Sequence, residues 1–200
     1  MSQNYEEQRA LIWNREQIFA YELATLLIQK PKVTVWMLML PLLFLFFMQD
    51  LKKYKAGIRG FADGFLENKR IALDLAFKAL RDGAFLGRVL EDFAAGSRSE
   101  SAGHSDLVES QLGEVAFLAA HYQRLMMEKG LSYEALVQKA YGTAGQYHQF
   151  LDKLFDLEDA VLEAAFQVQE PDADGRALAG KMRSAARRMR REAGDRIFQA

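Results

Sequence analysis

Apolar and polar residues follow the period of an α-helix along most of this chain of 200 residues. Between residues 54 and 81 the apolar residues recur every three or four positions, from Ile58 and Phe61 to Phe77 and Leu80. No segment alternates with a period of two for long enough to form a strand. The pattern therefore predicts an all-α protein.

Glycine, proline and small polar residues divide this pattern into separate helices. We expect Asn4, Ser105 and Ser132 to cap three of them, Asp82-Gly83 to end another, and the polar residues 96–105 to form an exposed loop. Because the connections are short, the core helices should pack antiparallel in a bundle. The expected helices outside the apolar block cover residues 4–30, 54–81, 84–95, 105–129, 133–141, 145–168 and 176–200.

One block, Val33–Met48, is apolar on all sides. Fourteen of its sixteen residues are apolar, Thr34 and Pro41 being the exceptions, and no charge occurs between Lys32 and Asp50. A helix of about 17 residues spans about 26 Å, slightly less than the roughly 30 Å of a bilayer core. We favour a single uncleaved transmembrane anchor. Its expected anchor residues are Val33, Trp36, Leu38, Leu40, Pro41, Leu43, Phe44, Phe46 and Phe47.

Two other interpretations of this block stay open. It could enter the membrane without crossing it, with a bend at Pro41, or it could form the central helix of a bundle and be buried on all sides. If the segment spans a membrane, three basic residues lie within about 20 positions of its amino-terminal end. Five basic residues, one of which is Lys69, lie within the same distance of its carboxy-terminal end. This difference places the bulk of the chain on the cytoplasmic side of an inner or plasma membrane.

Residues 22–47 resemble the beginning of ABC-2-type transporter permeases. The stretch ELATLLIQKPKVTVWMLMLPLLFLFF places an amphipathic helix and a basic turn with proline before a first apolar helix, as those permeases do. The resemblance rests on this topology, and the further spans of such a permease are missing from the chain. It implies a similar way into the membrane and does not imply transport.

Charge is distributed very unevenly, although the formal net charge is only −1. Residues 96–175 hold five basic and fourteen acidic residues, whereas residues 176–200 hold eight basic and two acidic ones. An acidic bundle is therefore followed by a basic helix. The expected organisation is an amphipathic helix over 1–32 that could lie at the membrane surface, the anchor over 33–49, the helical bundle over 50–168, an acidic hinge over 169–175 and a basic amphipathic helix over 176–200.

The basic helix is the clearest candidate for binding an anionic partner. It could bind anionic lipid headgroups beside the anchor, pack on the acidic face of its own bundle, or contact nucleic acid, which is the least favoured of the three. The residues expected to make these contacts are Arg183, Arg187, Arg188, Arg190 and Arg191.

No catalytic motif is found in the sequence. The chain has no cysteine, no glycine-rich phosphate loop and no zinc-binding pair of histidines. His121 and His148 lack the carboxylate three positions earlier that a di-metal bundle site uses. We expect no catalytic residue, no metal and no cofactor, and no small-molecule substrate is indicated.

Two clusters of side chains could still carry chemistry. The acidic stripe, Asp152, Asp156, Asp159 and Glu163, is best explained as a solvated helix face. The tyrosines, Tyr122, Tyr133, Tyr141 and Tyr147, are best explained as packing residues.

The sequence thus favours a non-enzymatic, single-span, membrane-anchored helical protein that acts as a scaffold or interaction module on the cytoplasmic face. Its expected partners are the lipid bilayer and a second protein of unknown identity. The alternative is a soluble all-α regulatory or binding protein that buries residues 33–48 in its core or in an oligomer interface. A helical metalloprotein or enzyme, using His121, His148, Glu114 and Asp152, is a remote alternative.

Overall fold

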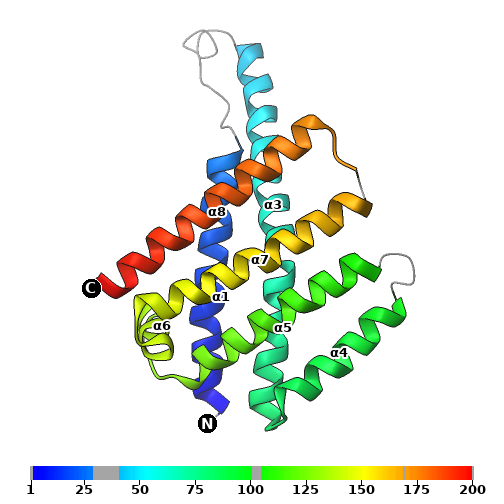
Figure 1. Cartoon of the computed structure of the whole chain (residues 1–200). Helices are drawn as coiled ribbons and strands as arrows, with labels where there is room; N and C mark the ends of the chain where they lie inside the picture. The colour runs from blue at the N-terminus through cyan, green and yellow to red at the C-terminus, as the bar shows by residue number, and fades with distance from the viewer. Residues whose placement is uncertain (1, 29–40, 101–104, 169, 200) are drawn as a thin grey trace.

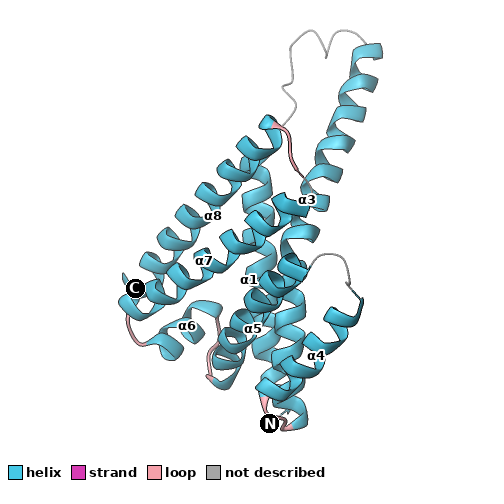
Figure 2. Cartoon of the chain, turned by 45° about the vertical axis from the view of Figure 1, so that its right-hand side comes forward, coloured by secondary structure: helices cyan, strands magenta, loops and turns pink. Residues whose placement is uncertain are grey.

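The structure is a computed structural model that describes residues 2–28, 41–100, 105–168 and 170–199, with the backbone alone at residues 2, 3, 41–52 and 100. The described residues form seven helices, and no strand occurs among them (Figures 1 and 2). The all-α prediction is therefore confirmed. The helices are α1 (Ser2–Leu27), α3 (Pro41–Asp82), α4 (Leu86–Glu100), α5 (Ser105–Met127), α6 (Tyr133–Tyr141), α7 (Ala144–Val168) and α8 (Ala173–Gln199).

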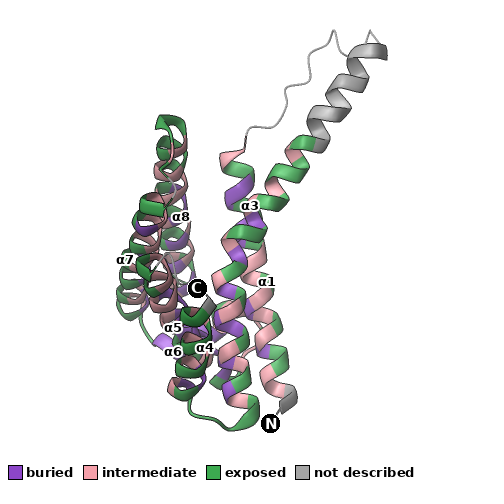
Figure 3. Cartoon of the chain, turned by 90° about the vertical axis from the view of Figure 1, so that its right-hand side faces the viewer, coloured by how far each residue is buried: buried purple, intermediate pink, exposed green. Residues whose placement is uncertain are grey.

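The helices pack in two layers. Helices α1 and α3 run antiparallel to each other and form one layer, whereas α4, α5, α7 and α8 lie side by side in the other, with neighbours antiparallel (Figures 1 and 3). The short α6 lies at the turn between α5 and α7. Because each helix buries one apolar stripe, the two layers enclose a common core.

The core lies where the second layer crosses α1 and α3. Its centre is made by fully buried side chains from α1, α5, α6 and α7, each of which contributes about 1.5–3 kcal/mol of burial free energy. The largest of them are Ile12, Leu118, Tyr122, Leu125, Met126, Leu136 and Leu151.

Alanines let α1 and α3 approach each other closely. Ala20 and Ala24 of α1 and Ala62 of α3 are completely buried, and Ala72 and Ala76 continue the buried face of α3. A side chain as small as alanine separates two helix backbones less than leucine does. The small residues on the buried face of α3 therefore allow α1 to pack close to its backbone.

The glycine and serine residues predicted to end or cap helices do so at several positions. Gly83 follows the last residue of α3 with a φ of +63°, and Gly142 ends α6 with a φ of +70°, a backbone region that favours glycine. The Ser132 hydroxyl accepts a 3.2 Å hydrogen bond from the backbone N–H of Ala135, which confirms it as the N-cap of α6.

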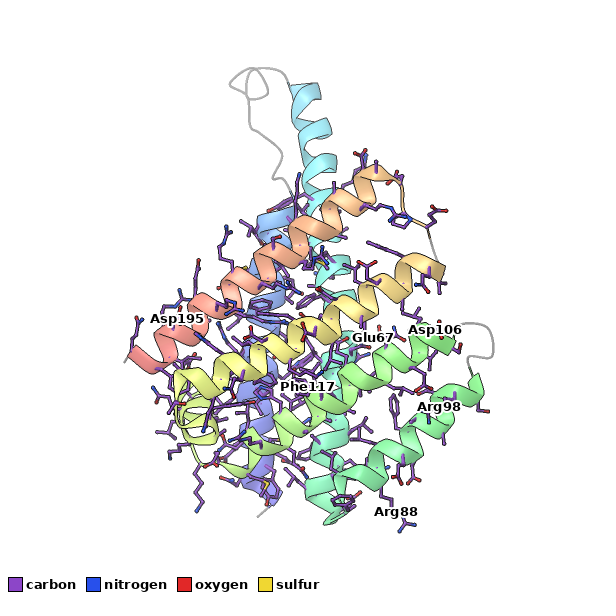
Figure 4. All side chains as sticks on the ribbon, in the orientation of Figure 1. Glu67, Arg88, Arg98, Asp106, Phe117 and Asp195 are labelled. Carbon is purple, nitrogen blue, oxygen red and sulfur yellow. The ribbon has the colours of Figure 1, made fainter. Side chains whose placement is uncertain are left out.

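Three local predictions were wrong. Helix α8 begins at Ala173, so residues 173–175 of the expected acidic hinge are helical. Asn4 lies inside α1, which begins at Ser2. Helix α4 continues to Glu100, so residues 96–100 are helical although a loop was expected. A contact with the neighbouring helix favours this extension, because Arg98, labelled in Figure 4, donates hydrogen bonds of 2.5 and 2.8 Å to Glu109 of α5.

The predicted transmembrane anchor is not supported. Among the described residues, no helix has both the length and the apolar character needed to cross a bilayer. Val33, Trp36, Leu38 and Leu40 lie outside the described residues. The remaining anchor residues, Pro41, Leu43, Phe44, Phe46 and Phe47, belong to the first turns of α3, where the backbone alone is described.

Candidate functional site

The basic helix α8 packs on the acidic helix α7 through ion pairs. Arg187 Nη2 lies 2.5 Å from Asp159 Oδ2, and Arg183 Nη1 lies 3.6 Å from Asp159 Oδ1. Arg191 pairs with Asp152. The three arginines are four positions apart and therefore share one face of α8. Since all five side chains are partly exposed, each pair contributes at most about 1 kcal/mol.

The other two predicted arginines face different surroundings. Arg188 is exposed, and its Nε lies 3.9 Å from Glu192 Oε1 on the same helix. Arg190 points into the bundle and is only 9% exposed. Four of the five arginines thus face carboxylates of α7, as one of the three alternatives for the basic helix expected, and Arg188 faces a carboxylate of α8 itself. Their role as residues that bind an external anion stays a prediction.

Arg190 belongs to a buried ion cluster of four residues, which are Lys69, Glu114, Glu158 and Arg190. Each comes from a different helix, α3, α5, α7 and α8 respectively. Arg190 Nη1 lies 2.6 Å from Glu158 Oε2. Lys69 Nζ lies 3.4 Å from Glu158 Oε1 and 3.8 Å from Glu114 Oε1. Asn68 Nδ2 donates a 2.9 Å hydrogen bond to Glu114 Oε2.

Aromatic rings cover the two cations of the buried ion cluster. The Lys69 ammonium lies 4.0 Å from the centre of the Phe65 ring, and the Arg190 guanidinium lies 5.0 Å from the Phe19 ring. Rings attract cations through their negative faces and also exclude water. The ion pairs of the cluster are therefore screened less than those on the surface.

The cluster shifts the pKa values of its strongest pair. Burial alone would raise the pKa of the Glu158 carboxyl, but the charges of Arg190 and Lys69 outweigh burial and lower it from 4.5 to about 2. Burial likewise opposes the charge of Arg190, but the Glu158 carboxylate outweighs it and raises the Arg190 pKa. Both groups are therefore ionised throughout the physiological pH range.

A cavity of about 390 Å³ lies next to the buried ion cluster, between α3, α5, α7 and α8. Lys69, Glu114 and Glu158 of the cluster line it, together with Asn68. Glu67, labelled in Figure 4, lines it from α3. Charged and amide groups from several helices thus line the same cavity, which is an arrangement typical of a binding site.

His121 is a core residue. It is stacked on Phe150, with the ring centres 4.1 Å apart, and its Nδ1 forms a 2.7 Å hydrogen bond with the Tyr141 hydroxyl. Burial, aided by the positive charges of Arg124 and Arg190, lowers the pKa of His121 from 6.5 to about 3. The imidazole is therefore neutral at physiological pH.

The tyrosine cluster packs in the same core. Tyr122 donates a 3.0 Å hydrogen bond to Glu16, and the hydroxyls of Tyr133 and Tyr147 lie 3.4 Å apart. Burial raises the pKa of Tyr122, Tyr133 and Tyr147, so these hydroxyls stay protonated. The interpretation of the tyrosines as packing residues is confirmed.

The residues of the metalloprotein alternative do not converge. His148 Nε2 lies 3.1 Å from Oδ1 of Asp195, which is close to the end of α8 and is labelled in Figure 4. Glu114, by contrast, faces Lys69 and Asn68. Asp152 pairs with Arg191. Among the described residues, no group of three or more histidine, aspartate or glutamate side chains could hold a metal ion.

Sequence reasoning missed most of this site. The sequence predicts a solvated acidic stripe, but Asp152 and Asp159 pair with arginines of α8. The carboxylate that pairs with the two buried cations is that of Glu158, which lies next to the stripe and is not part of it. From the sequence alone, Lys69 is only one of the basic residues near the predicted anchor. A usable signal was present, because Lys69 occupies a core position between Leu66 and Leu73 on the buried face of α3.

Comparison of the chain with protein-family models, with curated proteins and with solved structures gives no match.

Proposed function

We propose that this chain is a non-enzymatic helical binding protein that buries its apolar segment, residues 33–48, in an interface with a second copy of itself. The observation that carries the proposal is the position of the first part of α3, which extends beyond the ends of α1 and α8 (Figures 1 and 2).

The packing of α3 supports this proposal. Ile28, which directly follows α1, lies level with Gly57 of α3, since a Cβ added to Gly57 would lie 3.7 Å from Ile28 Cδ1. Residues 53–61 of α3 are exposed or half-buried, and Ala62 is its first buried residue among those whose side chains are described. From Gly57 back to Pro41 the helix rises about 24 Å further. Its apolar beginning therefore stands away from the core.

The apolar character and the length of this segment favour a second copy of the chain as the partner that covers it. Each leucine or phenylalanine left in water forgoes about 1.5–3 kcal/mol of burial free energy, so a continuous apolar segment requires a cover. The sixteen residues of Val33–Met48 are fewer than the roughly 20 usual for crossing a bilayer. A twofold pairing of identical segments would cover both copies at once.

The test is the molar mass of the full chain in detergent-free buffer, measured by light scattering after size exclusion. We expect the wild type to be a dimer and the double variant Leu43→Glu with Phe46→Glu to be a monomer. The matched control is Phe85→Glu with Leu131→Glu, because these side chains are 82% and 100% exposed on turns of the bundle. This control should stay a dimer.

Two outcomes would overturn the proposal. The first is a wild type that is monomeric at micromolar concentration without detergent. The second is a wild type that floats with phospholipid vesicles and loses this property in the Leu43→Glu and Phe46→Glu variant, which would assign the segment to a membrane instead.

A further inference from the structure

The cavity between α3, α5, α7 and α8 has an apolar and a polar part. Its apolar lining includes Phe65, Val161, Ala165 and Met182. Its polar lining from α3 and α5 comprises Glu67, Asn68, Lys69, Gln111 and Glu114. A volume of about 390 Å³ lies near the lower end of the range for small-molecule sites. We infer that this cavity binds a small uncharged ligand with an apolar body and one hydroxyl or carbonyl group.

The charges around the cavity argue for an uncharged ligand. Lys69 faces Glu158 and Glu114, and both Arg183 and Arg187 face Asp159. Each cation in the lining thus already has a carboxylate beside it, and the remaining carboxylate, Glu67, is exposed and can be solvated by water. A charged ligand would have to compete for one of these partners and would leave another charge uncompensated, which is costly in a site of low dielectric.

Neutral hydrogen-bonding groups are available to such a ligand. Asn68 uses its Nδ2 to donate to Glu114, which leaves its carbonyl oxygen as an acceptor. The Gln111 amide makes no hydrogen bond to the side chains and backbone described by the structure, so it can both donate and accept. A ligand hydroxyl could therefore donate to Asn68 Oδ1 and accept from the Gln111 amide, and a ligand carbonyl could accept from the Gln111 amide.

Lys69 can add a donor without losing its partners. Its ammonium lies 3.4 Å from both the Phe65 carbonyl oxygen and Glu158 Oε1, and 3.8 Å from Glu114 Oε1. These distances are longer than the usual 2.7–2.9 Å or so of a charge-assisted hydrogen bond. A ligand oxygen at the polar side of the cavity could therefore accept a closer bond from this ammonium.

The test compares three probes that share one alkyl chain, octanol, octanoate and octylamine, by isothermal titration calorimetry with the full chain. We expect octanol to bind and both charged probes to bind at least tenfold more weakly. Replacing Gln111 by leucine removes one polar contact and should weaken octanol about fivefold, since a neutral hydrogen bond contributes about 1 kcal/mol.

A pair of matched variants locates the site. Ala165→Phe on α7 fills the apolar part of the cavity and should weaken octanol at least tenfold. Ala160→Phe adds the same ring to the same helix at an exposed position outside the cavity, and it should bind octanol like the wild type. Circular dichroism confirms that each variant is folded before binding is measured.

Three results would overturn the inference. They are an absence of octanol binding to the folded wild type, tighter binding of either charged probe, and equal octanol affinity in Ala165→Phe and Ala160→Phe. The inference is separable from the proposed interface, because the Leu43→Glu and Phe46→Glu variant should bind octanol as tightly as the wild type does.

Discussion

Replacing Arg190 by methionine tests how much the buried ion cluster stabilises the fold. The Arg190 side chain is 10% exposed and its partner Glu158 is 21% exposed. Methionine keeps an apolar stem but removes the charge. The Glu158 carboxylate is then left with Lys69, 3.4 Å away, as its remaining cation. Removing one partner of a buried pair typically costs about 3–5 kcal/mol.

The structure allows a second estimate of the magnitude. The pKa of Glu158 is lowered from 4.5 to about 2 against the opposing effect of burial, with Arg190 the larger and Lys69 the smaller favourable cause. At about 1.36 kcal/mol per pKa unit, the shift corresponds to roughly 3 kcal/mol, which is the favourable effect of both cations less the opposing effect of burial. We therefore expect Arg190→Met to lower the free energy of unfolding by about 2–3 kcal/mol at neutral pH.

The pH dependence of this loss has a defined sign. Because the pKa of Glu158 is lower in the folded state, its ionised form stabilises the fold above pH 4.5. This contribution disappears as the pH falls from 4.5 towards 2, where the carboxyl becomes protonated in the folded state too. The difference between wild type and Arg190→Met should therefore shrink over the same pH window.

Urea unfolding followed by circular dichroism, at neutral pH and at several values below pH 4.5, measures both effects. The matched control is Arg188→Met, because Arg188 lies on the same helix but is 64% exposed. It should change the free energy of unfolding by less than about 0.5 kcal/mol. Equal losses in the two variants, or a loss in Arg190→Met that does not change with pH, would refute the reasoning.

Three further variants test single residues by the same unfolding measurement. His121→Phe should become more stable relative to wild type as the pH falls from 6.5 to about 3, since the buried imidazole stays neutral while the unfolded chain takes up a proton. Ser132→Ala should cost about 1 kcal/mol by removing the N-cap of α6, whereas Ser184→Ala, at an exposed position of α8, should not destabilise. Gly142→Ala should cost about 1 kcal/mol or more because φ is +70°, whereas Gly145→Ala meets open space at an ordinary φ and should be neutral or stabilising.

Each of these expectations has a clear counter-result. A stability difference in His121→Phe that is constant across the pH range would mean that the imidazole is not held neutral. Equal effects of the two serine variants would remove the role of the cap. A Gly142→Ala variant as stable as Gly145→Ala would mean that the left-handed backbone at that position is not required.

The sequence by itself determined where most helices begin and end. The cap at Ser132 and the stops at Gly83 and Gly142 depend on hydrogen bonds and backbone angles within a few residues. Such interactions join residues that are close in the sequence, so the order of residues is enough to predict them. Residues 96–100 are helical although a loop was expected, and the contact that favours the helix there joins Arg98 to Glu109, eleven positions away on another helix.

Only the tertiary structure decided which charges meet. The sequence indicated an acidic bundle and a basic helix, but the pairing of Arg190 with Glu158, and of Lys69 with both Glu158 and Glu114, depends on four helices packing around one point. The cavity beside them arises from the same packing. The energy of a charge depends on burial and on the distance to its partner, and a linear pattern specifies neither of them.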